Sequence, residues 1–176
     1  MDRPRENVRR AINSLRYDGV GDIELLTGDM EPQARAVAEL VGADGYQAQL
    51  LPEQKAEAVL KLQTQGNGVV MVGDGINDAP ALAYADVGVS LGSKSIETSD
   101  VVIGRDDPMM IPELRRLSRA TMRIVRENFA LVVGVNSVGL ILGAASGISV
   151  MMSALLHNIS TILVVANSLR LMFFPP

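Results

Sequence analysis

Short apolar runs alternate with helical patterns over the first hundred residues of the chain. Strand-length apolar runs occur at residues 23–26, 46–51, 69–72, 87–91 and 100–103, and the segments between several of them carry apolar positions at helical spacing. Strands and helices that alternate in this way are typical of β-α-β units. The pattern therefore predicts an α/β fold with a Rossmann-like parallel sheet.

Three of the predicted helices have recognisable ends. Residues 4–16 place Val8, Ile12 and Leu15 on one helical face. A second helix opens at Glu31-Pro32 and stops at Gly42, because proline suits the first turn of a helix and glycine suits its end. A third follows Pro52 and covers residues 53–65. A short helix is also expected near Ser95.

Two longer apolar runs follow, at residues 129–145 and 151–174, with a predicted turn over residues 146–149 between them. Each run approaches the roughly 20 residues that a helix needs to cross a bilayer. A helical hairpin buried in a soluble protein is the alternative, but the length and the lack of charge favour a transmembrane hairpin.

Charge divides the chain into the same two parts. Up to Asn128 charged residues are frequent, whereas His157 and Arg170 are the only ionisable side chains after it. An arginine-rich segment, residues 115–126, precedes the first apolar run and indicates a cytosolic flank. The net charge of −4 and the scarcity of aromatic residues give no support to nucleic-acid binding. The absence of cysteine fits a reducing compartment.

The central run leads into the string V-V-M-V-G-D-G-I-N-D-A-P-A-L at residues 69–82. It predicts a buried parallel strand that turns at Gly73 and Gly75 and places Asp74 at its carboxyl end, where open α/β sheets bind ligands. Asp78 follows one helical turn later, with Asn77 as the expected helix cap. Two neighbouring carboxylates without cysteine or histidine nearby favour Mg²⁺ over zinc. An ordinary Gly-Asp-Gly turn is the alternative.

Two further residues are expected at the same edge of the sheet. Thr27 follows the first predicted strand and Lys55 lies in the first turn of the helix after the second. A hydroxyl, a cation and a metal-binding carboxylate around one anionic group suit phosphoryl transfer. Taken singly, T-G-D is an ordinary turn and Lys55 an ordinary surface lysine.

The order of these motifs resembles the P-type ATPases, whose cytosolic phosphorylation domain has the haloacid dehalogenase fold. The matching strings are T-G-D at residues 27–29, P-x-x-K at 52–55 and G-D-G-x-N-D at 73–78. The resemblance implies that Thr27 hydrogen-bonds the phosphoryl group of an aspartyl phosphate and that Lys55 neutralises its oxygens. It also implies that Gly28 and Asp29 shape the loop, that Asp74 holds Mg²⁺, and that Asp78 and Asn77 support the same site.

The family's nucleophile, the first aspartate of D-K-T-G-T, is absent from this sequence, as is the domain that binds ATP. The chain thus resembles the C-terminal part of a pump. The implied organisation is a phosphorylation-domain portion with an incomplete sheet at residues 1–107, a stalk helix at 108–128 and two transmembrane helices at 129–176. By itself this chain is expected to be inactive and to need the missing N-terminal part.

Polar groups inside the predicted spans are candidates for cargo binding, because burying them in a bilayer is costly. They are Asn136, His157, Asn158 and Ser160, although Asn and Ser also serve helix–helix packing. The second span resembles the last membrane helix of heavy-metal P-type ATPases. Copper pumps have methionine at the position of His157 and tyrosine at that of Val135, whereas zinc and cadmium pumps have aspartate for His157. We therefore expect a divalent ion such as Zn²⁺, Mn²⁺, Co²⁺ or Ni²⁺.

The expected function is that of an ATP-driven metal efflux pump, multi-pass in the cell membrane with its N-terminal part in the cytosol. The alternative hypothesis is a non-catalytic membrane protein that keeps the fold as a Mg²⁺-binding or partner-binding module. The missing nucleophile supports the alternative, whereas the retention of Thr27, Lys55, Asp74 and Asp78 together argues against it.

Overall fold

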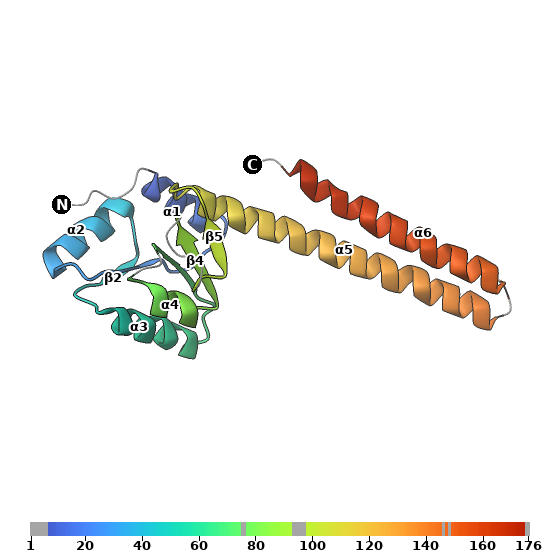
Figure 1. Ribbon diagram of the computed structural model, residues 1–176, viewed down its shortest axis with the longest axis horizontal. Helices are drawn as coiled ribbons and strands as arrows, with labels where there is room; N and C mark the ends of the chain where they lie inside the picture. The colour runs from blue at the N-terminus through green and yellow to red at the C-terminus, as the bar shows by residue number, and fades with distance from the viewer. Residues whose placement is uncertain (1–6, 75–76, 93–97, 146, 148, 175–176) are drawn as a thin grey trace. The chain divides into compact units, whose positions relative to one another are not determined.

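The computed structural model describes residues 7–74, 77–92, 98–145, 147 and 149–174, which fall into two compact units, Met1–Pro112 and Glu113–Pro176. The first unit alternates helices and strands (Figure 1). Its elements are α1 (Val8–Tyr17), β1 (Glu24–Leu26), α2 (Glu31–Val41), β2 (Gly45–Gln47), α3 (Pro52–Thr64), β3 (Val70–Gly73), α4 (Ala79–Tyr84), β4 (Val87–Leu91) and β5 (Val101–Ile103).

The strands pair in parallel, as predicted, but they form two sheets. β1 pairs with β2, with Leu25 opposite Tyr46. The second sheet has the order β3-β4-β5, with Val72 opposite Val89 and β5 at its edge. Within the part of the chain that the structure describes, β1 and β3 are not paired with each other. The incomplete Rossmann-like sheet is therefore present in two pieces.

Two details of the strand predictions are wrong. The second strand ends at Gln47, because the amides of Gln49 and Leu50 bond to the loop after β1 and leave the strand pairing. β3 is not buried on both faces: Met71 is 9% exposed but Val70 is 56% exposed. Residues 4–6, Gly75 and the helix expected near Ser95 lie outside the described residues.

The core of this unit lies between the second sheet and the helices α3 and α4. Val59, Met71, Ala81 and Leu82 form one buried cluster, and Leu26 of β1 packs against it. Full burial of a side chain such as Val59 or Leu82 contributes roughly 1.5–3 kcal/mol. Since Leu26 reaches this cluster, apolar packing connects the two sheets.

Carboxylates satisfy backbone amides that precede the strands. Asp44 accepts a hydrogen bond from the amide of Ile23 at 2.9 Å, and Asp86 accepts one from the amide of Val69 at 2.8 Å. The hydrogen bond from Arg16, followed by that from Ile23, holds the pKa of Asp44 below its usual value. The bond from Val69 lowers the pKa of Asp86 in the same way. These bonds give the amides of Ile23 and Val69 hydrogen-bond partners directly before β1 and β3 begin.

The second unit is a pair of antiparallel helices (Figure 1). α5 covers Met110–Ala144, so the predicted stalk and first span are one continuous helix of 35 residues. α6 covers Val150–Ser168 and passes into a 3₁₀ helix, η1, at Leu169–Phe173. Both α5 and the segment Met151–Phe173 are long and apolar enough to cross a membrane. At 1.5 Å per residue α5 is about 52 Å long, which exceeds a hydrocarbon core of about 30 Å.

Gly88 provides a test of the packing between α4 and β4. A Cβ at this position would lie 2.5 Å from the carbonyl oxygen of Leu82, which is backbone and cannot turn away. We expect Gly88→Ala to destabilise the first unit by about 2 kcal/mol and to lower its Tm by roughly 8–16 °C, as measured by circular dichroism of the detergent-solubilised chain. Gly68→Ala is the control, since nothing lies within 4 Å of its Cβ. Equal Tm values for the two variants would contradict the prediction.

Candidate functional site

The Thr-Gly-Asp loop after β1 is closed by its own side chains. The Thr27 hydroxyl donates to Asp29 Oδ2 at 3.1 Å and accepts from the Asp29 amide at 3.1 Å. The loop also accepts backbone bonds, from Gln49 to the Asp29 carbonyl at 2.8 Å and from Leu50 to the Thr27 carbonyl at 3.0 Å. Thr27 is half-buried, so its hydroxyl is held in place at the carboxyl end of β1.

Lys55 forms an ion pair with Asp78. Its Nζ donates to Asp78 Oδ1 at 2.7 Å, and the two side chains are only 12% and 15% exposed. The sequence assigned Lys55 to a phosphoryl group and Asp78 to Mg²⁺ without linking them. The structure brings the two side chains together, although Lys55 lies in α3 and Asp78 directly precedes α4.

Gly73 allows the carboxylate of Asp78 to lie against the end of β3. A Cβ on Gly73 would lie 2.5 Å from Asp78 Oδ2. Asp74 follows directly and is exposed. The expected cap at Asn77 is wrong: α4 begins at Ala79 with Asp78 as its N-cap, whose side chain makes no capping hydrogen bond. The ion pair with Lys55 explains this, because it engages the Asp78 carboxylate.

The carboxyl ends of β1 and β3 thus carry complementary chemistry. Asp74 and Asp78 offer oxygen ligands only, which suits Mg²⁺, an ion that takes one or two carboxylates and completes its shell with water and phosphate. Among the described residues no group of three His, Cys, Asp or Glu side chains could hold a metal ion. The donor set therefore fits a hydrated Mg²⁺ that acts together with a phosphoryl substrate.

The sequence analysis missed the segment that links the two halves of this site. Gln49, which has a positive φ of 57°, and Leu50 donate their amides to the Thr-Gly-Asp loop. The next residue, Leu51, leads into α3, where its carbonyl accepts a hydrogen bond from the Lys55 amide at 3.1 Å. These contacts use the backbone, so residue type carries no signal for them.

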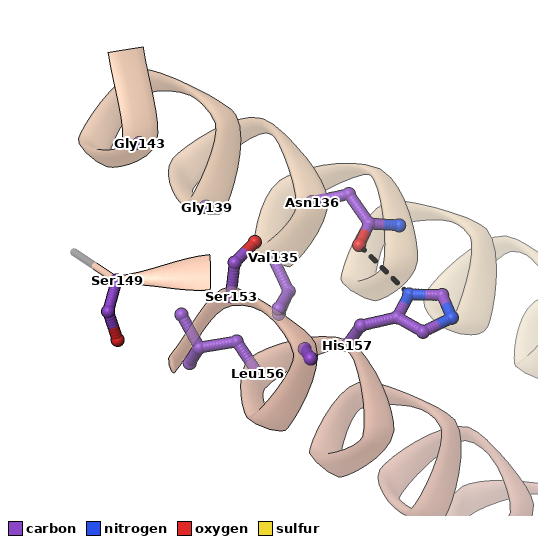
Figure 2. Close-up of a pocket in the computed structure, with 9 residues that line it drawn as sticks. Val135, Asn136, Gly139, Gly143, Ser149, Ser153, Leu156 and His157 are labelled. Atoms are coloured by element: carbon purple, nitrogen blue, oxygen red, sulfur yellow. Dashed lines mark hydrogen bonds between the residues drawn. The ribbon is translucent and has the colours of Figure 1, made fainter. Parts of the chain in front are cut away.

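The second unit contains a groove of about 530 Å³ between α5 and α6. Its lining includes Asn136, His157 and Val135, together with small residues. Figure 2 shows the side chains of Asn136 and His157 pointing toward each other, with His157 Nδ1 3.4 Å from Asn136 Oδ1. Two of the predicted cargo ligands, Asn136 and His157, are therefore neighbours.

Ser160 does not line this groove. It is 2% exposed, and its hydroxyl donates to the carbonyl of His157 at 2.7 Å within α6. The Thr161 hydroxyl donates to the same carbonyl at 3.2 Å. Serine and threonine hydroxyls commonly bond backward along a helix in this way.

Three kinds of comparison relate the chain to known proteins. Residues 1–86 match the family model of haloacid dehalogenase-like hydrolases. The chain is 42% identical over 174 residues to a zinc-exporting P-type ATPase of Mycobacterium marinum (strain ATCC BAA-535 / M) and 41% identical over 174 residues to a manganese-exporting P-type ATPase of Mycobacterium leprae (strain TN). Both alignments cover 97% of this chain but 24% of the relative, so the chain spans about a quarter of their length.

The crystal structure of a zinc-transporting PIB-type ATPase in the E2·Pi state is also similar to this chain. The TM-score is 0.91 at 35% sequence identity, and the match covers 97% of this chain and 28% of that protein. The similarity includes both the α/β unit and the helix pair, because together they make up the matched length.

The ion pair between Lys55 and Asp78 can be tested by removing its cation. We expect Lys55→Met to lower the free energy of unfolding by about 1–3 kcal/mol, because it leaves a largely buried carboxylate without its partner. Urea denaturation of the detergent-solubilised chain measures the loss. In the double variant with Asp78→Leu the loss should be smaller than the sum of the two single losses.

Lys61→Met is the matched control, because Lys61 is an exposed lysine on the same helix. It should change the free energy of unfolding by no more than about 0.5 kcal/mol. Equal losses for Lys55→Met and Lys61→Met would show that the pair does not stabilise the unit.

Proposed function

We propose that this chain, which is similar over 97% of its length to zinc- and manganese-exporting P-type ATPases, is the C-terminal portion of an ATP-driven pump that exports a divalent transition-metal ion. The α/β unit is the cytosolic phosphorylation-domain portion, and α5 and α6 are two spans of a multi-pass protein of the cell membrane. The observation that carries the proposal is the ion pair between Lys55 and Asp78, with Thr27 directly after β1 and the exposed Asp74 directly after β3.

The two separate sheets suggest where the missing nucleophile belongs. β1 and β3 each pair on one side only within the described residues, and a candidate site residue directly follows each of them, Thr27 after β1 and Asp74 after β3. A further parallel strand between them would join the two pieces into one sheet. Its carboxyl end would then lie beside Thr27 and Asp74, which is where an aspartyl phosphate is needed.

Each residue has a distinct part in the proposed phosphoryl transfer. Thr27 would turn its hydroxyl proton from Asp29 Oδ2 to a phosphoryl oxygen, and Lys55, oriented by Asp78, would offset negative charge. Asp74 holds Mg²⁺, with Asp78 and Asn77 nearby, while Gly28 and Asp29 maintain the loop. When bound, Mg²⁺ would neutralise charge on the transferred group. ATP would be supplied by a nucleotide-binding domain outside this chain.

The membrane unit would supply part of the cargo site. His157 offers an imidazole nitrogen and Asn136 an amide oxygen, and the two face each other across the groove. Imidazole suits zinc and neighbouring first-row ions, whereas Cu⁺ prefers soft thiolate or thioether ligands. The relatives named above export zinc and manganese, both divalent. Ser160 would contribute only through its remaining lone pair, because its proton is directed to the His157 carbonyl.

Asp74→Asn tests the Mg²⁺ assignment. The assay uses a chimera in which this chain replaces the corresponding C-terminal quarter of the zinc-exporting relative. We expect Asp74→Asn to reduce phosphoenzyme formation from labelled ATP by roughly 10²-fold or more, because charge on the transferred group is then poorly neutralised. Asp22→Asn, at an exposed carboxylate ahead of β1, is the control. A normal phosphoenzyme level in Asp74→Asn would show that Asp74 does not hold a catalytic Mg²⁺. If the unaltered chimera forms none, the non-catalytic alternative is favoured.

His157→Ala tests the cargo assignment in the same chimera. We expect at least a roughly tenfold rise in the Zn²⁺ concentration that half-maximally stimulates ATP hydrolysis, because a nitrogen ligand is lost. His157→Met should shift the preference toward Cu⁺, since it introduces a thioether. Leu155→Ala, at a residue of α6 outside the groove lining, is the control. Unchanged metal dependence in His157→Ala would assign this residue to packing.

A further inference from the structure

A polar network joins α5 and α6 at the end of the pair away from their connecting turn. Asn128 Nδ2 donates to Ser168 Oγ at 2.9 Å, and Asn167 Nδ2 donates to Asn128 Oδ1 at 2.9 Å. We call Asn128, Asn167 and Ser168 the polar clamp. Arg170 extends it, donating to Glu127 Oε2 at 3.0 Å and to Asn167 Oδ1 at 2.9 Å.

The clamp residues are half-buried and bonded on several sides. The Ser168 hydroxyl accepts from Asn128 and donates to the Val164 carbonyl at 2.9 Å. Asn167 donates to Asn128 and accepts from Arg170, so both ends of its amide have partners. α6 ends at Ser168 and the 3₁₀ helix η1 begins at Leu169, so the change of helix type coincides with the clamp.

Between the clamp and the groove, side-chain hydrogen bonds do not join the two helices in the described part of the chain. α5 is entirely apolar at residues 129–135. On α6, Ser160 and Thr161 direct their hydroxyls to the His157 carbonyl of their own helix. Among the described residues of the pair, side-chain hydrogen bonds between the two helices thus occur in the clamp region and between Asn136 and His157.

Apolar faces specify the register of membrane helices weakly. Lipid tails are as apolar as the side chains, so a pair that slips by one turn exchanges one set of apolar contacts for another. A hydrogen-bonding group loses its partner on such a slip, which is costly in a water-poor environment. A single polar residue fixes the register of coiled coils for the same reason.

We propose that the polar clamp sets the register of α5 against α6 and thereby holds His157 opposite Asn136. Eight residues separate Asn128 from Asn136 and eleven separate Ser168 from His157, so the two polar contacts are about 12–16 Å apart along the pair. A slip of one turn, about 5.4 Å, separates both pairs of residues at once. Asn128, Asn167 and Ser168 are therefore positioning residues. Their importance for metal rests on the proposed function, whereas their control of register does not.

The test uses the full chain in lipid nanodiscs. It contains no cysteine, so two nitroxide labels can be attached through Val133→Cys on α5 and Leu163→Cys on α6, whose native side chains are each 47% exposed. We expect one narrow distance distribution in the labelled chain. Asn128→Leu with Asn167→Leu should broaden it or shift it by about 5 Å, the rise of one helical turn.

Two matched variants separate register from general damage. Thr161→Val removes a hydroxyl bond that stays within α6 and should leave the distribution unchanged. Asn128→Ser combined with Ser168→Asn exchanges the two partners and should restore the narrow distribution.

A narrow, unshifted distribution in Asn128→Leu/Asn167→Leu overturns the proposal, as does the same broadening in Thr161→Val. Should the double leucine variant fail to form the helix pair, Asn128→Ala is measured instead and judged by the same criterion.

Ring-¹⁵N NMR of His157, the chain's one histidine, provides the link to metal. With Zn²⁺ alone as the probe, we expect the unaltered chain to show ring shifts and the Asn128→Leu/Asn167→Leu variant to need at least tenfold more Zn²⁺ for the same shifts. If the label distances change in Asn128→Leu/Asn167→Leu but its zinc titration equals that of the unaltered chain, the clamp does not position His157 for metal. If the unaltered chain gives no zinc-dependent shift, the cargo role of His157 fails, while the label distances still decide the register.

Discussion

The ion pair between Lys55 and Asp78 is the contact on which the candidate phosphoryl site depends. The α/β unit consists of two parallel sheets without strand pairing between β1 and β3, so other contacts must hold the strand ends in place. Lys55 belongs to the helix that follows the first sheet, and Asp78 follows the first strand of the second. Because both side chains are largely buried, their charges attract each other more strongly than they would at the surface. Apolar packing of Leu26 against the core supports the same junction.

This arrangement has a consequence for the proposed phosphoryl transfer. A lysine that is held by a carboxylate is oriented before a phosphoryl group arrives, so less conformational entropy is lost on binding. Gly73 is part of the same geometry, since any larger residue would displace the Asp78 carboxylate from the end of β3. The site is thus organised by residues on two sheets, and a strand that joined those sheets would bring its own terminal residue among them.

The helix pair of the second unit, which we propose lies in the membrane, follows a different rule. In the α/β unit apolar burial decides which faces meet, but between helices in a bilayer that driving force is weak. Hydrogen bonds at the clamp and between Asn136 and His157 then carry the directional information. The helix α5 runs without interruption from Met110 to Ala144, past the clamp and the groove. A displacement of this helix along its axis would therefore reach both polar contacts together.

The sequence by itself determined the elements and the chemistry of each segment. Periodicity located the parallel strands and the two long apolar helices, because it records which faces are buried, and the motifs around Thr27, Lys55 and Asp74 predicted the similarity to P-type ATPases that the comparisons found. Only the tertiary structure decided which groups meet. The pairing of Lys55 with Asp78, the cap at Asp78 in place of Asn77 and the early end of β2 depend on contacts between distant segments, several of them through the backbone. The facing of Asn136 and His157 likewise depends on helix register, which apolar sequence does not encode.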